Sequence, residues 1–148
     1  MPAHVLIAND DEASRRVLRT VLERAGYSVE EANNLETTLA RLRAATSPLV
    51  VLLDFSYARW NGTAVINASS RNPLLARRHA YILMLLRDET FPLMTAQNVA
   101  QMHVKLLAKP FNTDHLLAAV MAAAHKLDVQ HGGTLIMTPP QVGEQSPK

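Results

Sequence analysis

The chain contains no cysteine and few aromatic residues, and each shortage excludes a class of protein. Without cysteine there can be no disulfide, no thiolate nucleophile and no cysteine-bound zinc site. Aromatic residues make up 5% of the 148 residues, and the arginines are scattered over several segments. Direct nucleic-acid binding favours clustered cations interleaved with aromatic side chains, so it is not expected here.

Long hydrophobic runs and glycine-rich loops are also missing. No apolar stretch approaches the roughly 20 residues that cross a bilayer, and no signal-peptide pattern opens the chain. We therefore expect a cytoplasmic protein with no membrane attachment. The five glycines form neither a dinucleotide-binding fingerprint nor a phosphate-binding loop, which disfavours nucleotide enzymes. The length fits a single domain.

Short apolar runs alternate with amphipathic segments along most of the chain. The runs predict strands at 4–8, 27–32, 49–53, 81–86 and 103–108. The segments between and after them predict helices at 11–25, around 35–42, at 63–70, 95–102 and 113–127. The runs are continuously apolar, so both faces of each strand should be covered. This order predicts an α/β fold of flavodoxin type, with a doubly wound, five-stranded parallel sheet and five helices.

Folds of this type bind ligands at the carboxyl ends of the strands, and polar side chains that can form one cluster follow three of the predicted strands there. They are Asn9 and Asp10 after the first strand, Asp54 at the end of the third, and Lys109 after the fifth. Two carboxylates suit Mg²⁺, which also keeps waters and phosphate oxygens as ligands. A lysine ammonium suits a phosphoryl oxygen. A carboxylate can also be the nucleophile itself and form an aspartyl phosphate.

The acids after the first strand have a second interpretation as helix caps. An aspartate at a helix N-terminus accepts hydrogen bonds from unpaired N–H groups and interacts favourably with the helix dipole. Capping suits Asp11 and Glu12 best. Asp54 and Lys109 at neighbouring strand ends favour a metal role for Asp10.

With these residues in this order, the chain resembles the receiver domain of two-component response regulators, which has the fold of chemotaxis regulators. The motifs that carry the resemblance are Asn9-Asp10-Asp11, Leu52-Leu53-Asp54, Asn61-Gly62 and Lys109-Pro110-Phe111. The resemblance implies a receiver domain over residues 1–128. Residues 129–148, rich in glycine and proline, are expected to be a flexible tail or the start of a linker.

The resemblance also implies a role for each matching residue. Asp54 would accept a phosphoryl group from a histidine kinase or phosphotransfer protein, and Lys109 would contact the phosphoryl oxygens. The bond before Pro110 would be cis. Mg²⁺ would be the cofactor, with ligands expected from Asp10, Asp54, the backbone carbonyl of Ser56 and, weakly or through water, Asn9.

Among the departures from the family pattern, three bear directly on the phosphoryl site and its switch. Asn9 stands where the family usually has a second acid, which should weaken Mg²⁺ binding. Leu86 falls where a serine or threonine normally contacts the phosphoryl group, and Leu106 falls at an aromatic switch position. The usual hydroxyl–aromatic coupling cannot operate with these residues, so the sequence indicates an atypical receiver. The alternative is a phosphorylation-independent pseudo-receiver that acts as a protein-interaction or dimerisation module.

The last predicted helix is apolar on nearly all sides, with four alanines around its expected core. The residues expected to face the core are Leu116, Leu117, Val120, Met121, Ala124 and Leu127. A helix of this kind is usually covered on more than one side, which predicts a homodimer or partner contact. The alternative is that alanine is present because it favours helix.

Overall fold

Five parallel strands form one sheet in the order β2-β1-β3-β6-β7, which confirms the predicted architecture. In the computed structural model the described residues are 3–57, 60–86 and 93–132. The strands are β1 (His4–Ala8), β2 (Ser28–Ala32), β3 (Leu49–Asp54), β6 (Ala80–Leu86) and β7 (Val104–Lys109). Because β1 pairs with β2 on one side and β3 on the other, the winding direction reverses there and opens a crevice at the carboxyl ends.

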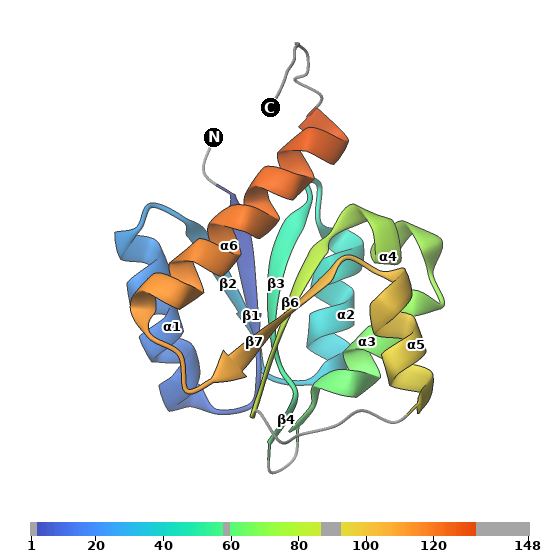
Figure 1. Cartoon of the computed structure of the whole chain (residues 1–148), viewed down its shortest axis with the longest axis horizontal. Coiled ribbons are helices and arrows are strands. Elements are labelled where there is room, and N and C mark those ends of the chain that lie inside the picture. The colour runs from blue at the N-terminus through green and yellow to red at the C-terminus, as the bar shows by residue number, and fades with distance from the viewer. Residues whose placement is uncertain (1–2, 58–59, 87–92, 133–148) are drawn as a thin grey trace.

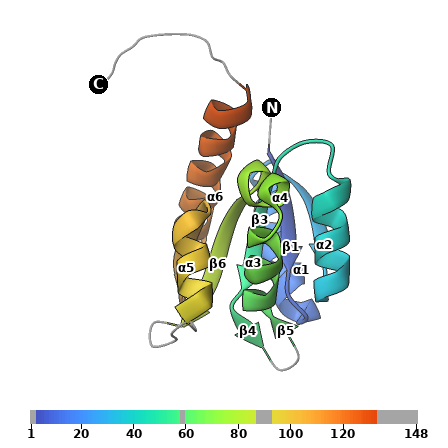
Figure 2. The same ribbon diagram turned by 90° about the vertical axis from the view of Figure 1, so that its right-hand side faces the viewer.

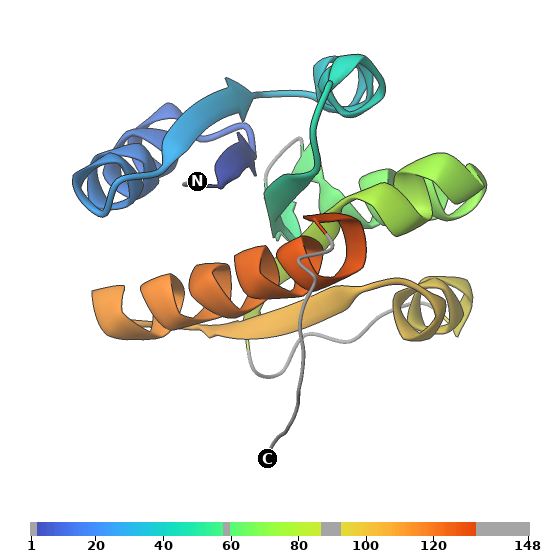
Figure 3. The same cartoon turned by 90° about the horizontal axis from the view of Figure 1, so that it is seen from above.

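Helices cover both faces of this sheet. They are α1 (Glu12–Arg24), α2 (Leu35–Ala44), α3 (Gly62–Ser70), α4 (Pro73–Arg78), α5 (Leu93–Gln101) and α6 (Thr113–Leu127). Figure 1 shows α1 and α6 on one side of the sheet and α2, α3 and α5 on the other, and Figure 3 shows the same layers from above. The core accordingly forms two clusters: Ile7, Leu22 and Val120 belong to one, and Leu42 and Ile66 to the other.

The central strands are buried on both faces, as the continuous apolar runs predicted. Every residue of β3 is buried, and so is all of β1 after His4. The last strand differs, because Lys105, Leu106 and Ala108 are exposed. Strand β7 pairs with β6 alone and lies at the edge of the sheet. An edge strand has a neighbour on one side only, so its side chains are covered less completely.

Asparagine and aspartate side chains begin four of the helices. Asp11, Asn34, Asn72 and Asn112 each accept a hydrogen bond from a backbone N–H in the following turn. The Asn72–Pro73 pair begins α4, with proline in the first turn where its missing N–H costs nothing. Within the described residues there are consequently six α-helices rather than the five predicted.

A short hairpin stands between β3 and α3. Strand β4 (Ser56–Tyr57) pairs antiparallel with β5 (Trp60–Asn61), and Figure 2 shows the pair beyond the carboxyl end of β3. The Asn61–Gly62 motif is therefore a strand end followed directly by the first residue of α3. The hairpin places the start of α3 against the end of β3.

The last helix buries most of the face predicted for it, with one exception. Leu116, Val120 and Leu127 are buried, and Leu117 and Ala124 pack against the core, but Met121 is 64% exposed, and Ala119 and Ala123 are buried instead. The buried positions, at the helical spacing of three and four, are Leu116, Ala119, Val120, Ala123 and Leu127. In a helix that is apolar all round, the hydrophobic pattern cannot choose between neighbouring faces. Packing against the sheet favours the face with small alanines, because it lets the helix approach closely.

The chain stays helical beyond α6. A π-helical turn, η1 (Asp128–Gly132), continues four residues into the segment expected to be a tail. The remaining residues of that segment, 133–148, lie outside the described part. Among the described helices, none is both long and apolar enough to span a membrane.

Candidate functional site

Asp54 is the last residue of β3 and is 3% exposed. Its two carboxylate oxygens have different partners. Lys109 Nζ, at the end of β7, donates to Oδ1, and Asn9 Nδ2, just beyond β1, donates to Oδ2 at 3.3 Å. A buried carboxylate is costly unless it is paired and hydrogen-bonded. These contacts lower that cost, and the fold brings residues from the ends of three strands together.

The side-chain orientation of Asn9 follows from its second contact. Asn9 Oδ1 accepts a hydrogen bond from the backbone N–H of Asp11 at 2.7 Å. An N–H can only donate, so the amide oxygen must face Asp11 and the amide nitrogen must face Asp54. Asn9 is 1% exposed. Its oxygen thus already accepts one hydrogen bond within its own loop, and one lone pair of that oxygen is left for a metal-bound water.

Asp10 follows Asn9 and is partly exposed. Strands β1 and β3 are neighbours, with Ala8 level with Leu53, so Asp10 and Asp54 leave adjacent strand ends. Ser56 begins β4 two residues after Asp54. The described residues contain no group of three His, Asp or Glu side chains placed to hold a metal. Two carboxylates and a backbone carbonyl are nevertheless a donor set that fits Mg²⁺, because this ion keeps several waters and takes phosphoryl oxygens as further ligands.

Asp11 caps α1, which confirms the interpretation made from the sequence. Its carboxylate accepts from the Ser14 backbone N–H at 2.9 Å and also from the Ser14 hydroxyl. These hydrogen bonds hold the pKa of Asp11 below its usual value, since they stabilise the charged form. The neighbouring acid, Glu12, pairs with Arg16 at the surface. The adjacent acids therefore differ in role. Asp11 and Glu12 interact with residues of α1, whereas Asp10 lies beyond the end of β1, where a metal ligand is expected.

Gly62 lies against the backbone that carries Asp54. Its N–H donates to the Phe55 carbonyl at 2.8 Å, and a Cβ at this position would lie 1.9 Å from the Asp54 carbonyl oxygen. No side chain fits at such a distance. The glycine of the Asn61–Gly62 motif is thus required by the close approach of α3 to the end of β3.

An open hollow of about 610 Å³ adjoins these residues. Its wall includes Asn9, Asp54 and Lys109 on the polar side, and Val17, Leu86 and Phe111 on the apolar side. The Lys109–Pro110 peptide bond at its edge is cis.

The two predicted switch positions fall in different places. Leu86 is in the wall of the hollow and is 49% exposed, so methyl groups line the position where a hydroxyl was expected. Leu106 of β7 pairs with Leu83 of β6 in the sheet. Leu83 belongs to the core cluster that also contains Leu42 of α2 and Ile66 of α3. Leu106 itself is 47% exposed.

One contact at this site was not predicted. Arg15 Nη1 donates to the Asn9 carbonyl oxygen at 2.9 Å, while its Nε donates to Glu31. The sequence did contain a signal for the contact with Glu31. Arg15 and Arg19 are four residues apart on one face of a helix, and Glu31 is a charged residue within a short predicted strand. The pattern did not reveal that a backbone carbonyl beside the site would be the second partner.

Comparison with known proteins identifies the family. A model of the response regulator receiver domain matches residues 5–121. The chain belongs to this family. No curated protein matches the sequence significantly. Receiver domains are signalling modules of two-component systems, and this domain is a signalling module rather than a conventional enzyme.

Solved structures share the receiver fold at low sequence identity. A CheY-like receiver domain protein from Methanospirillum hungatei JF-1 is 23% identical, with a TM-score of 0.76, over 86% of this chain and 98% of that one. Chemotaxis protein CheY4 from Vibrio cholerae is 24% identical, with a TM-score of 0.67, over 83% and 99% of the two chains. An adenylate cyclase structure from Rhodopirellula baltica is 20% identical, with a TM-score of 0.72, over 90% and 96%. At these identities the likeness extends to the fold alone.

Proposed function

We propose that this receiver domain accepts a phosphoryl group on Asp54 from a histidine kinase or phosphotransfer protein, with Mg²⁺ as cofactor. The observation that supports this most directly is the buried Asp54 carboxylate, with Lys109 on one oxygen and the Asn9 amide on the other. A carboxylate placed at the carboxyl end of a central strand and beside an open hollow can be reached by a phosphorylated partner.

The chemistry is a transfer of the phosphoryl group from nitrogen to oxygen. An oxygen of Asp54 attacks the phosphorus of a phosphohistidine, the P–N bond breaks as the O–P bond forms, and the imidazole leaves with the electron pair and takes up a proton. The Asn9 contact to Oδ2, at 3.3 Å, is long for a hydrogen bond and is correspondingly weak. Lys109 would then balance charge on the phosphoryl oxygens. Mg²⁺, held by Asp10, Asp54 and the Ser56 carbonyl, would neutralise charge on the transferred group.

Intact-mass spectrometry after incubation with acetyl phosphate and Mg²⁺ tests the proposal. We expect a single phosphoryl adduct on the wild type and none on Asp54→Ala. Asp114→Asn, which removes an exposed acid from the first turn of α6, is the matched control and should keep the adduct. If folded wild-type protein takes up no phosphoryl group from acetyl phosphate or from its kinase, phosphorylation is not its function.

Restoring the second acid should strengthen Mg²⁺ binding. In Asn9→Asp the new carboxylate adds a negative charge beside Asp54, and we expect the Mg²⁺ concentration for half saturation to fall about tenfold, or ~1.4 kcal/mol. Without Mg²⁺ the same variant should unfold at a lower temperature than wild type, because two carboxylates would then face each other. Thermal unfolding with and without Mg²⁺ measures both effects.

Asn9→Ala is the control for that substitution. It also removes the amide donor to Asp54, but it adds no charge, so it should lose stability without gaining Mg²⁺ affinity. Equal Mg²⁺ affinities for Asn9→Asp and Asn9→Ala would contradict the assignment of this edge of the sheet as the metal site.

The second candidate is a phosphorylation-independent interaction module. Leu86 and Leu106 favour it, because neither can form a hydrogen bond that depends on the phosphoryl group. Absence of the adduct in the experiment on Asp54 would support this alternative. A homodimer through the last helix, whose exposed residues include Ala118, Met121 and Ala122, stays a prediction. So do the cytoplasmic location and the expected lack of nucleic-acid and membrane partners.

A further inference from the structure

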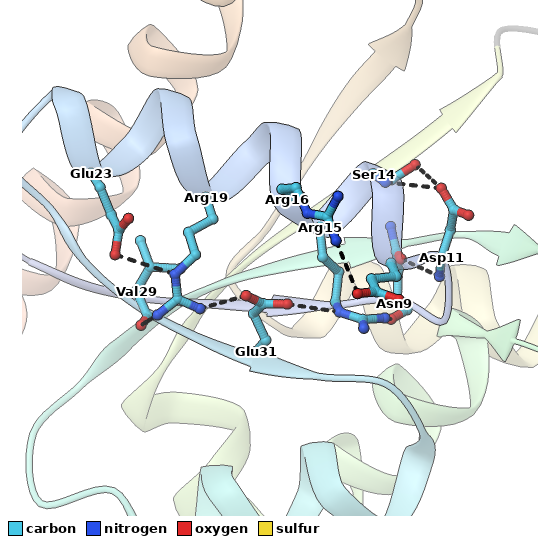
Figure 4. A network of polar contacts seen from close by, with 10 residues as sticks. Asn9, Asp11, Ser14, Arg15, Arg16, Arg19, Glu23, Val29 and Glu31 are labelled. Atoms are coloured by element: carbon cyan, nitrogen blue, oxygen red, sulfur yellow. Dashed lines mark hydrogen bonds and ion pairs between the residues drawn. The ribbon is translucent and has the colours of Figure 1, made fainter.

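Arg15 connects the acidic loop of the site to the edge of the sheet. It lies in the first turn of α1, and its side chain is 12% exposed. Its guanidinium donates to two different partners: Nη1 to the carbonyl oxygen of Asn9 at 2.9 Å, and Nε to Glu31 Oε1 at 2.8 Å. Figure 4 shows Arg15 between Asn9 and Glu31.

Glu31 is itself held firmly. It lies in β2, level with Ile7 of β1, and its second oxygen accepts from Arg19 Nη1. Arg19 also donates to the Val29 carbonyl at 2.9 Å. Partial burial of Glu31 opposes ionisation, but the hydrogen bonds from Arg19 and Arg15 outweigh it and hold the pKa of Glu31 below its usual value. Glu31 is therefore a fixed anion that orients the planar guanidinium group of Arg15.

The carbonyl that Arg15 binds belongs to the peptide bond between Asn9 and Asp10. A peptide unit is planar, so holding its oxygen limits the rotation of the whole unit. That rotation sets the direction in which the Asp10 side chain leaves the loop. It also sets the position from which the Asn9 amide reaches Asp54.

We propose that Arg15, oriented by Glu31, is a positioning residue that directs Asp10 and Asn9 toward Asp54. This inference rests on the proposed phosphorylation of Asp54 for its consequence, although the contacts themselves do not. The neighbouring Arg16 gives the contrast. Arg16 pairs with Glu12 at 3.0 Å, and both side chains are 74% exposed. This contact is an ordinary surface ion pair, which contributes little to stability.

The first test measures the Mg²⁺ requirement of phosphorylation in Arg15→Met, Glu31→Gln and the control Arg16→Met. Loss of a residue that orients metal ligands typically costs tenfold or more in affinity, so Arg15→Met should raise the half-saturating Mg²⁺ concentration roughly tenfold. The rate at saturating Mg²⁺ should change little. Glu31→Gln should shift in the same direction by less, and Arg16→Met should match wild type.

The second test needs neither metal nor phosphate. Hydrogen exchange of the Asp11 amide, which donates to Asn9 Oδ1, reports whether the loop is held. Exchange at Asp11 should become faster in Arg15→Met, while the Tyr81 amide, bonded to the His103 carbonyl in the sheet, should not change. Arg16→Met should leave both amides unchanged. Arg15→Lys keeps the positive charge but lacks the planar guanidinium group that donates to two partners at once. The exchange rate of the Asp11 amide in this variant should therefore lie between those of wild type and Arg15→Met.

The two tests separate the possible failures. If wild type takes up no phosphoryl group, the proposed function fails, and the exchange rates together with a direct Mg²⁺ titration still decide the role of Arg15. If Arg15→Met lowers the unfolding temperature but leaves both Asp11 exchange and Mg²⁺ affinity as in wild type, Arg15 is only a structural residue and the inference is overturned.

Discussion

Replacing Gly62 with alanine is expected to destabilise the protein strongly and to impair phosphorylation at the same time. The added Cβ would stand 1.9 Å from the Asp54 carbonyl oxygen and 3.0 Å from the Phe55 carbonyl oxygen. Both obstacles are backbone atoms, so no side-chain rotation relieves the clash. Overpacking of this kind costs about 3 kcal/mol, at the upper end of the usual range, since the end of β3 or the start of α3 must move.

Thermal unfolding and phosphorylation should be measured together on this variant. For a domain of this length, a loss of about 3 kcal/mol lowers the unfolding temperature by roughly 6–12 °C. Gly26→Ala is the matched control. Gly26 has φ +98° after α1, with no atom within 4 Å of an added Cβ, so alanine there should cost only about 1–2 kcal/mol of backbone strain. Gly26→Ala should phosphorylate normally, because the turn is remote from Asp54. If Gly62→Ala and Gly26→Ala are phosphorylated equally well, the shift of backbone at Gly62 does not disturb Asp54, and the expected loss of phosphorylation is contradicted.

Replacing His79 with leucine is expected to cost about 2–4 kcal/mol of folding free energy, because it leaves a buried donor and a buried acceptor without their partner. His79 is fully buried, and its Nδ1 accepts from the Leu49 N–H at 3.0 Å. The other ring nitrogen must then carry the proton, and it donates to the Leu42 carbonyl at 3.1 Å. Leu42 is in the last turn of α2, where carbonyl groups have no partner within the helix. His79 thus ties the end of α2 to the start of β3.

Denaturant unfolding of His79→Leu measures this contribution. The control is His125→Leu, which removes an exposed histidine from α6 and should change stability by less than about 0.5 kcal/mol. Leucine is apolar and nearly fills the space, so a loss of stability would reflect the missing hydrogen bonds rather than a large cavity. If His79→Leu unfolds at the same denaturant concentration as wild type, the two backbone groups must find other partners, and the ring is dispensable.

Much of the fold could be predicted because it depends on local patterns. Continuous apolar runs are typical of central parallel strands, and β1, β3 and β6 lie where such runs occur. Asn34 and Asn112 begin helices by accepting a hydrogen bond from a backbone N–H three residues on, a contact within one turn of chain. Where the pattern was ambiguous the prediction failed in part: α6 is apolar on nearly all sides, and only its packing against the sheet buries Ala119 and exposes Met121.

The sequence by itself determined which residues gather at the carboxyl ends of the strands, because the order of strands in this fold places Asn9, Asp54 and Lys109 there. The tertiary structure decided how those side chains act on one another. The bond from Asn9 to Asp54 joins residues 45 positions apart, and the contact from Lys109 spans 55. The close approach at Gly62 and the carbonyl bound by Arg15 involve backbone atoms, whose positions depend on how whole elements pack. Side-chain identity sets what a group can donate or accept, but only packing sets which group it meets.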